Sequence, residues 1–110
     1  GRDEAYLDVT KKTEMSFDNA EHLAQQLKNE IRNSLKLTCS IGISPNKLLS
    51  KIASDFKKPD GLTTVKPEQV EQFLSPLKIR EIPGIGKKTE DVFTQMDIHI
   101  IEELRKIKKN

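Results

Sequence analysis

Apolar and polar residues alternate with two different periods along the first sixty residues. Apolar positions recur at helical spacing from residue 17 to 35, which predicts one long amphipathic helix with Ser16 as its N-cap. Period-two alternation predicts strands at residues 5–10 and 37–43, and small residues on one face of the second allow another element to approach closely. Ser44 and Pro45 predict the start of a second helix. Its buried stripe is expected to comprise Leu48, Leu49, Ile52, Ala53 and Phe56.

The pattern changes after Gly61. A short extended piece leads to a helix opened by Pro67, and further helices are predicted at residues 87–95 and 100–108. The inward-facing apolar residues of these helices are expected to be Val70, Phe73, Leu74, Val92, Ile98 and Ile101.

Two lobes are therefore expected, over residues 1–60 and 61–110. The first contains strands with two packed helices, and the second contains helices alone. This order of elements predicts an α+β fold rather than a helical bundle.

Composition narrows the class of protein without naming a function. The chain has 110 residues, of which 35% are hydrophobic and 33% are charged, so a modest core is possible. A formal charge of +2 is too small to diagnose nucleic-acid binding. Cys39 is the single cysteine, which excludes a disulfide scaffold and a cysteine-based zinc site. We find no signal peptide and no apolar run of roughly 18–20 residues, so we expect a soluble, cytoplasmic protein without membrane contact.

Two neighbouring carboxylates, Asp3 and Glu4, stand at the start of the first predicted strand. Mg²⁺ prefers hard oxygen ligands, and phosphoryl transfer commonly uses two such ions. Consecutive strand residues point to opposite faces, so the pair can share a metal only at a turn or strand end. An acidic, solvent-facing strand end is the alternative that composition alone favours.

Lysines at helical spacing follow the second predicted strand. Lys47, Lys51 and Lys58 lie within residues 40–61, with Asp55 between the last two, and predict a partly basic ridge opposite the buried stripe. Lys58 stands beside a proline turn, where a long cationic side chain can reach a phosphate. A solvated helix face is the alternative and the usual explanation for isolated lysines.

The segment IPGIGKKT, residues 82–89, predicts a tight hairpin before a helix. Gly84 and Gly86 permit the positive φ that such a hairpin requires. The first N–H groups of the following helix lack partners, so a phosphate can bind there beside Lys87 and Lys88. This helix-hairpin-helix pattern binds the nucleic-acid backbone without reading sequence. A glycine-rich turn that binds nothing is the alternative.

Three stretches carry a resemblance to a known family. They are DEAYLD at residues 3–8, TCSIGISPNKLLSKIASDFKKPDG at 38–61 and IPGIGKKT at 82–89. In this order they resemble Y-family (translesion) DNA polymerases of the DNA polymerase IV type, and the resemblance covers essentially the whole chain. It implies the second half of the catalytic palm over residues 1–60 and a thumb with a helix-hairpin-helix over residues 61–110.

The resemblance also implies site residues and partners. Asp3 and Glu4 would be catalytic, metal-binding carboxylates, and Lys58 would contact the triphosphate of the incoming nucleotide. The backbone of the primer–template duplex would lie on Gly84, Ile85, Gly86, Lys87, Lys88 and Thr89. The implied reaction is low-fidelity, lesion-bypass addition of deoxynucleotides to a primer 3′ end with two Mg²⁺ ions. Any sliding clamp is expected to bind through regions outside this sequence.

The family's first strand, its fingers and its little finger are not found in this sequence. The first strand supplies another metal-binding aspartate, so we expect this chain alone to be a catalytically inactive fragment that still contacts duplex DNA. The strongest alternative is a non-catalytic helix-hairpin-helix DNA-binding module, although Asp3 and Glu4 would repel DNA. A nucleotide cyclase is a second alternative, but a cyclase has no duplex for the hairpin to grip.

Overall fold

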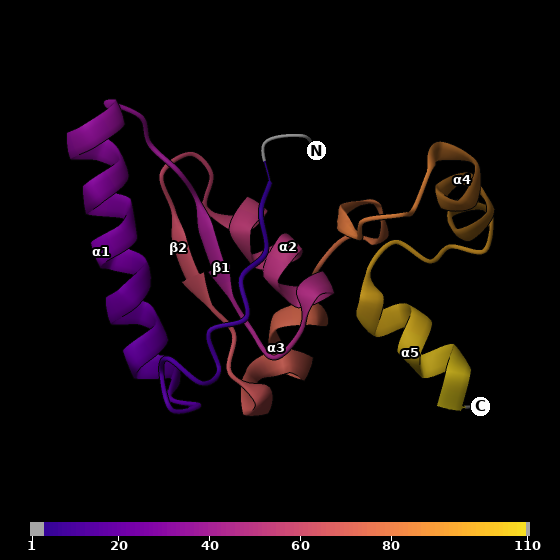
Figure 1. The fold of residues 1–110 in the computed structure, drawn as a ribbon. Helices are drawn as coiled ribbons and strands as arrows, with labels where there is room; N and C mark the ends of the chain where they lie inside the picture. The colour runs from indigo at the N-terminus through magenta and orange to yellow at the C-terminus, as the bar shows by residue number, and fades with distance from the viewer. Residues whose placement is uncertain (1–3, 110) are drawn as a thin grey trace. The chain divides into compact units, whose positions relative to one another are not determined.

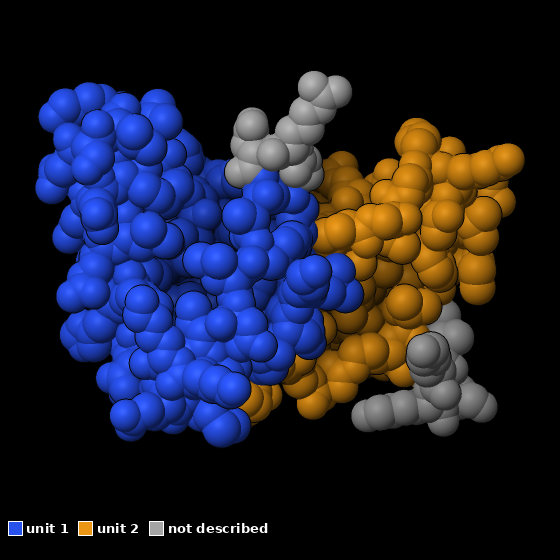
Figure 2. All heavy atoms as spheres, viewed as in Figure 1, with its two compact units in different colours: residues 1–66 blue, residues 67–110 orange. Residues whose placement is uncertain are grey.

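A computed structural model of the chain describes residues 4–109, with the side chains of residues 4–106. The chain divides into two compact units, residues 1–66 and residues 67–110 (Figure 2). The first unit combines helices with a small parallel sheet, and the second is built mainly of helices. The predicted α+β fold is confirmed.

A two-stranded parallel sheet with two helices forms the first unit. In chain order its elements are α1 (Phe17–Leu35), β1 (Ile41–Ile43), α2 (Lys47–Phe56) and β2 (Leu62–Thr64). Gly42 lies opposite Thr63 in the register of the two strands. Helix α2 makes the crossover that a parallel pair requires and packs against both strands, and α1 contacts both as well (Figure 1).

Helix α1 begins where the sequence predicts. The Ser16 hydroxyl accepts a hydrogen bond from the Asn19 backbone N–H at 3.1 Å, which satisfies one of the unpaired donors of the first turn. At the other end Lys36 adopts a left-handed conformation, with φ of 58°, and donates its N–H to the Arg32 carbonyl. Ala20 and Ala24 form the buried face.

Helix α2 begins later than predicted. Its N-cap is Asn46, whose side-chain oxygen accepts from the Leu49 N–H at 2.9 Å, so the predicted start at Ser44 and Pro45 is wrong. The Ser44 hydroxyl instead accepts from the Asn46 N–H at 3.2 Å and lies 2.7 Å from the Ser50 hydroxyl. Ser44 therefore supports the capping residue rather than capping the helix itself.

The buried stripe of α2 is narrower than predicted. Leu49, Ile52 and Ala53 are buried, but Leu48 and Phe56 are more than half exposed. Each strand has only three residues, so the sheet covers only the centre of the helix face. The close approach predicted for the small strand face is confirmed, because a Cβ on Gly42 would lie 2.2 Å from the carbonyl oxygen of Ser50.

The predicted strand at residues 5–10 is wrong, because residues 4–9 are irregular and residue 10 lies in a turn. The Asp8 carboxylate accepts from both the backbone N–H and the hydroxyl of Thr10, at 3.0 and 2.7 Å. The Met15 N–H then donates to the Thr10 carbonyl at 2.9 Å. These local bonds turn the chain at the point where a strand would continue.

Short helical segments build the second unit. They are η1 (Pro67–Gln69), α3 (Val70–Leu74), η2 (Ile79–Glu81), α4 (Lys87–Gln95) and α5 (Ile101–Lys109). An antiparallel bridge between Lys78 and Ile100 holds the unit together. Among the described residues, no helix is long and apolar enough to cross a bilayer.

The core of the second unit forms around that bridge, where Leu77, Ile79 and Ile98 are buried. The predicted burial of Ile98 is confirmed. The predicted burial of Val92 is wrong, because Val92 is more than half exposed.

Candidate functional site

The acidic pair is described only in part, because Asp3 lies outside the described residues. Lys51 on α2 donates a hydrogen bond from its ammonium to the Glu4 carboxylate. Both side chains are partly buried, with 27% of Glu4 and 23% of Lys51 exposed. The hydrogen bond from Lys51 lowers the pKa of Glu4 from 4.5 to about 2, and the same bond raises the pKa of Lys51. Glu4 therefore stays ionised to a lower pH than an ordinary glutamate.

Lys51 also links Glu4 to Lys58 through Asp55. The Lys51 Nζ lies 3.3 Å from one Asp55 oxygen, and the Lys58 Nζ lies 2.7 Å from the other. Burial acts to raise the pKa of Asp55, but hydrogen bonds from Lys58 and Lys51 outweigh it and the pKa is lowered. These four residues form the Glu4–Lys58 network. Its outer end reaches solvent, since 56% of the Lys58 side chain is exposed.

The predicted metal site is represented by one described carboxylate. No group of three or more His, Cys, Asp or Glu side chains within residues 4–109 is arranged to hold a metal ion. The carboxylate of Glu4 is the hard oxygen donor that Mg²⁺ prefers, yet its strong charged partner is Lys51. Glu4 thus suits the ion chemically and forms only part of a ligand set.

The lysines of the predicted basic ridge differ in their partners. Lys51 is bound to Glu4, and the Lys47 ammonium lies 5.1 Å from the centre of the Tyr6 ring. The spacing of Lys51 and Asp55 by four residues is a sequence signal for their pairing. Nothing in the local pattern indicates that Lys51 reaches Glu4, 47 residues away in the chain.

The glycine hairpin forms in the second unit between η2 and α4. Gly84 has φ of 93°, so the predicted positive φ is confirmed there. The prediction is wrong for Gly86, which has φ of −88° and ψ of 174° and stands at the N-cap of α4. The Ile85 N–H closes the turn by donating to the Ile82 carbonyl at 3.1 Å. The turn of 3₁₀ helix before the hairpin, η2, was not predicted from the sequence.

An open, uncapped helix end follows the hairpin. The Gly86 carbonyl accepts the first helical bond from the Glu90 N–H at 3.0 Å, and the N-cap makes no side-chain hydrogen bond. A Cβ on Gly84 or Gly86 would meet no atom within 4 Å. The start of α4 is therefore open to a ligand at Gly84 and Gly86.

The charged residues of this helix end differ in their pairing. Lys87, Lys88 and Thr89 are exposed. The Lys87 ammonium lies 3.1 Å from the Asp91 carboxylate, whose hydrogen bond raises the pKa of Lys87. Of these two lysines, Lys87 thus carries its own counter-ion.

Two family profiles match the chain. Residues 1–55 match the impB/mucB/samB family, and residues 67–98 match the IMS family HHH motif. The two matches cover much of the first unit and the hairpin region of the second.

Similar proteins include two DNA polymerases. The chain is 68% identical over 107 residues to DNA polymerase IV of Nitrosopumilus maritimus, covering 97% of this chain and 29% of that protein. It is 50% identical over 102 residues to DNA polymerase IV 2 of Methanosarcina mazei, covering 93% of this chain and 27% of that protein. The chain thus spans less than a third of the length of these relatives.

Solved structures of polymerases share the fold. The crystal structure of DinB from Sulfolobus solfataricus matches with a TM-score of 0.88 and 42% identity, over 96% of this chain and 31% of that one. The insertion ternary complex of Dbh DNA polymerase matches with a TM-score of 0.84 and 41% identity, over 94% of this chain and 29% of that one.

Proposed function

The chain belongs to the impB/mucB/samB family of Y-family DNA polymerases, and we propose that it forms part of a DNA-directed DNA polymerase that extends primer 3′ ends. The Glu4–Lys58 network gives this proposal its main support. It joins, within one unit, a carboxylate suited to a metal ion and a lysine suited to a triphosphate.

In this proposal residues 1–60 act as the second half of the palm. Asp3 and Glu4 would hold the metal together with ligands from elsewhere in the protein. When bound, two Mg²⁺ ions would activate the primer hydroxyl and neutralise the triphosphate. Glu4 offers an anionic oxygen at neutral pH, and the hydrogen bond from Lys51 keeps that carboxylate ionised to a lower pH than an ordinary glutamate. Lys51 also restrains that carboxylate between turnovers, because the ion pair ties it to α2.

Lys58 would bind the triphosphate of the incoming deoxynucleotide. Its ammonium is anchored to Asp55 at 2.7 Å and exposed enough to exchange that partner for a phosphate oxygen. A phosphate carries more charge than one carboxylate, so the exchange is favoured when a nucleotide is present.

Residues 61–110 would act as a thumb that holds the primer–template backbone. Two facts support the hairpin as the contact: the uncapped start of α4, and a Gly86 that the fold itself does not require. The remaining contacts would come from Gly84, Ile85, Lys87, Lys88 and Thr89. If Lys87 and Lys88 each neutralise one phosphate, affinity should fall about tenfold between about 50 and 200 mM salt. An affinity that hardly changed over this range would contradict the assignment.

Low fidelity, lesion bypass and a cytoplasmic location are proposed on family membership. A sliding clamp would bind outside this chain. We expect the isolated chain to incorporate no nucleotide, since the carboxylate that the structure describes is only part of a ligand set. Incorporation by the purified chain on a primed template would overturn that expectation.

Primer extension past an abasic site tests the proposed function. The assay compares the full-length protein that contains this chain with its Asp3→Ala/Glu4→Ala variant. Glu21→Ala, which removes an exposed carboxylate of α1, is the matched control. Extension by the wild type and the control, but not by the double variant, would support the polymerase and its metal ligands. Duplex binding without extension by any of them would favour the non-catalytic DNA-binding module.

A further inference from the structure

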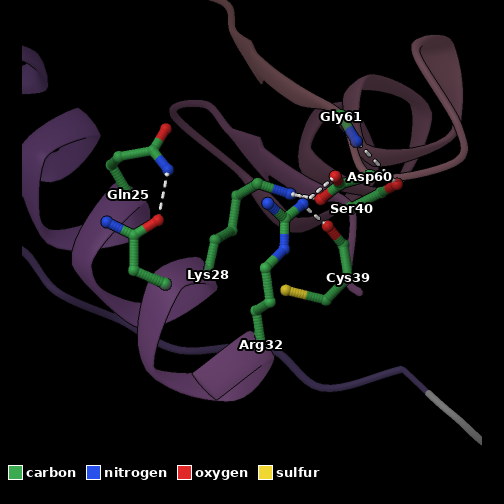
Figure 3. Close-up of polar contacts among 8 residues, drawn as sticks. Gln25, Lys28, Arg32, Cys39, Ser40, Asp60 and Gly61 are labelled. Atoms are coloured by element: carbon green, nitrogen blue, oxygen red, sulfur yellow. Dashed lines mark hydrogen bonds and ion pairs between the residues drawn. The ribbon is translucent and has the colours of Figure 1, made fainter. Parts of the chain in front are cut away.

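Two cations of α1 converge on the carboxylate of Asp60, in the turn that follows Lys58 (Figure 3). The Lys28 Nζ lies 2.6 Å from one oxygen of Asp60, and the Arg32 guanidinium donates to the other. We name Lys28, Arg32 and Asp60 the Asp60 clamp. The hydrogen bond from Lys28 is the main cause of the lowered pKa of Asp60.

Lys28 is the buried member of the clamp, with 9% of its side chain exposed, whereas 60% of Arg32 is exposed. Its ammonium also donates to the Cys39 carbonyl, just before β1. A buried ammonium is tolerated only when its donors are satisfied, and here Asp60 and Cys39 supply the acceptors. Lys28 therefore ties α1, the entry to β1 and the turn to one another.

The same turn is also fastened to the start of β1 through the backbone N–H and carbonyl of Gly61. The Gly61 N–H donates to the Ser40 hydroxyl at 3.1 Å, and the Gly61 carbonyl accepts from the Ile41 N–H at 3.0 Å. Asp60 itself has φ of 57°, a conformation that aspartate adopts more readily than most residues. Removing Lys28, the partner of the Asp60 carboxylate, would leave the hydrogen bonds of Gly61 intact. It would free Asp60, the residue of the turn nearer to Lys58.

We propose that the Asp60 clamp is a positioning device for the triphosphate of the incoming nucleotide, with Lys28 as its main positioning residue. Lys58 lies in the short segment between Asp55 and Asp60. The clamp holds the C-terminal end of this segment, because Asp60 lies two residues after Lys58. Helix α2 holds the N-terminal end of the segment, because Asp55 on this helix pairs with Lys58. The inference rests on the proposed function, because it assigns Lys28 a role that acts through Lys58.

Single-nucleotide insertion kinetics of the full-length protein test the clamp. The variants are Lys28→Met, Asp60→Asn, Lys58→Ala and the double variant Lys28→Met/Lys58→Ala. Asn29→Ala is the matched control, since it removes only the exposed hydrogen bond from Gln25 on the same helix. Asp60→Asn retains the shape of the side chain and tolerates positive φ, so it keeps the test valid if Lys28→Met does not fold.

We expect Lys28→Met and Asp60→Asn each to raise the nucleotide KM about tenfold while kcat changes less than about threefold. In the Lys58→Ala background, Lys28→Met should add less than about twofold, because the clamp acts through the missing ammonium. A merely structural role would lower kcat, because less of the protein is folded, and would leave the nucleotide KM unchanged in either background.

The outcomes separate the two proposals. An inactive wild type would overturn the polymerase assignment and the clamp with it. An active wild type whose KM rises for Lys58→Ala, but not for folded Lys28→Met or Asp60→Asn, would overturn the clamp alone. Independent, multiplying effects of Lys28→Met and Lys58→Ala would overturn it too.

Discussion

The Glu4–Lys58 network and the glycine hairpin present charge to a ligand in different ways. In the network, side chains from α2 and from two flanking segments pair with one another. At the hairpin, the backbone of an uncapped helix end is exposed, and its surroundings are kept clear by glycine. A site of paired side chains depends on packing across the unit, whereas a backbone site depends mainly on local conformation. The two sites should therefore respond differently to the same kind of substitution.

Gly42 and Gly86 give the sharpest form of this comparison. Gly42→Ala should destabilise the chain by about 3 kcal/mol, because the new Cβ would lie 2.2 Å from the Ser50 carbonyl oxygen and force α2 away from β1. Gly86→Ala is the matched control and should change stability by less than about 0.5 kcal/mol, since its Cβ meets nothing. Urea denaturation of both variants measures the difference. Equal stability of the two would mean that Gly42 is not a packing position.

Lys51→Met tests the paired site through pH. The pKa of Glu4 should rise from about 2 towards 4.5 when its partner is removed, which a carboxyl NMR titration measures. Because the folded-state pKa is lowered, the stabilisation by this pair is present above about pH 4.5 and is lost as the pH falls towards 2. The melting temperature of the wild type should therefore fall more steeply in this window than that of Lys51→Met.

Lys47→Met is the matched control for that titration, since Lys47 faces Tyr6 instead of Glu4. It should leave the pKa of Glu4 low. A low pKa in Lys51→Met as well would show that another group holds the Glu4 carboxylate.

Much of the fold follows from local pattern. The bounds and N-cap of α1, the bounds of α4 and the positive φ of Gly84 were predictable because each depends on neighbouring residues. The failures at residues 5–10 and at Leu48 have a different origin. A strand exists only when another strand pairs with it, and a helix residue is buried only where something covers it. Neither condition can be read from periodicity.

The candidate sites divide in the same way. The hairpin was predictable as a motif, although its two glycines have different roles: Gly84 adopts positive φ and Gly86 is the N-cap of α4. The partners of Glu4 and Asp60 were not, because Lys51 and Lys28 approach them from 47 and 32 residues away. Lysines at helical spacing look alike in a sequence, and only the fold distinguishes Lys51 from a solvated neighbour.

Gly86→Asp tests the backbone site. The substitution should weaken duplex DNA binding about tenfold, because a carboxylate at the N-cap would occupy and repel the phosphate position. Gly86→Asn is the matched control, similar in size and without charge. Both residues cap helices well, so neither should lower stability. Fluorescence anisotropy with labelled duplex measures the affinities. Equal affinity of the two variants would mean that no phosphate binds at this helix end.

The smallest effect is expected from Asp91→Ala. Asp91 holds the Lys87 ammonium at 3.1 Å, so its removal should free that cation for a phosphate. Exposed ion pairs are weak, and we therefore expect duplex affinity to rise only about two- to threefold. Glu68→Ala removes an equal charge from an exposed position in η1 and controls for the change in net charge. A rise that Glu68→Ala matched would come from overall charge and not from Lys87, whereas a rise specific to Asp91→Ala would identify Lys87 as a phosphate contact that its own helix partly neutralises.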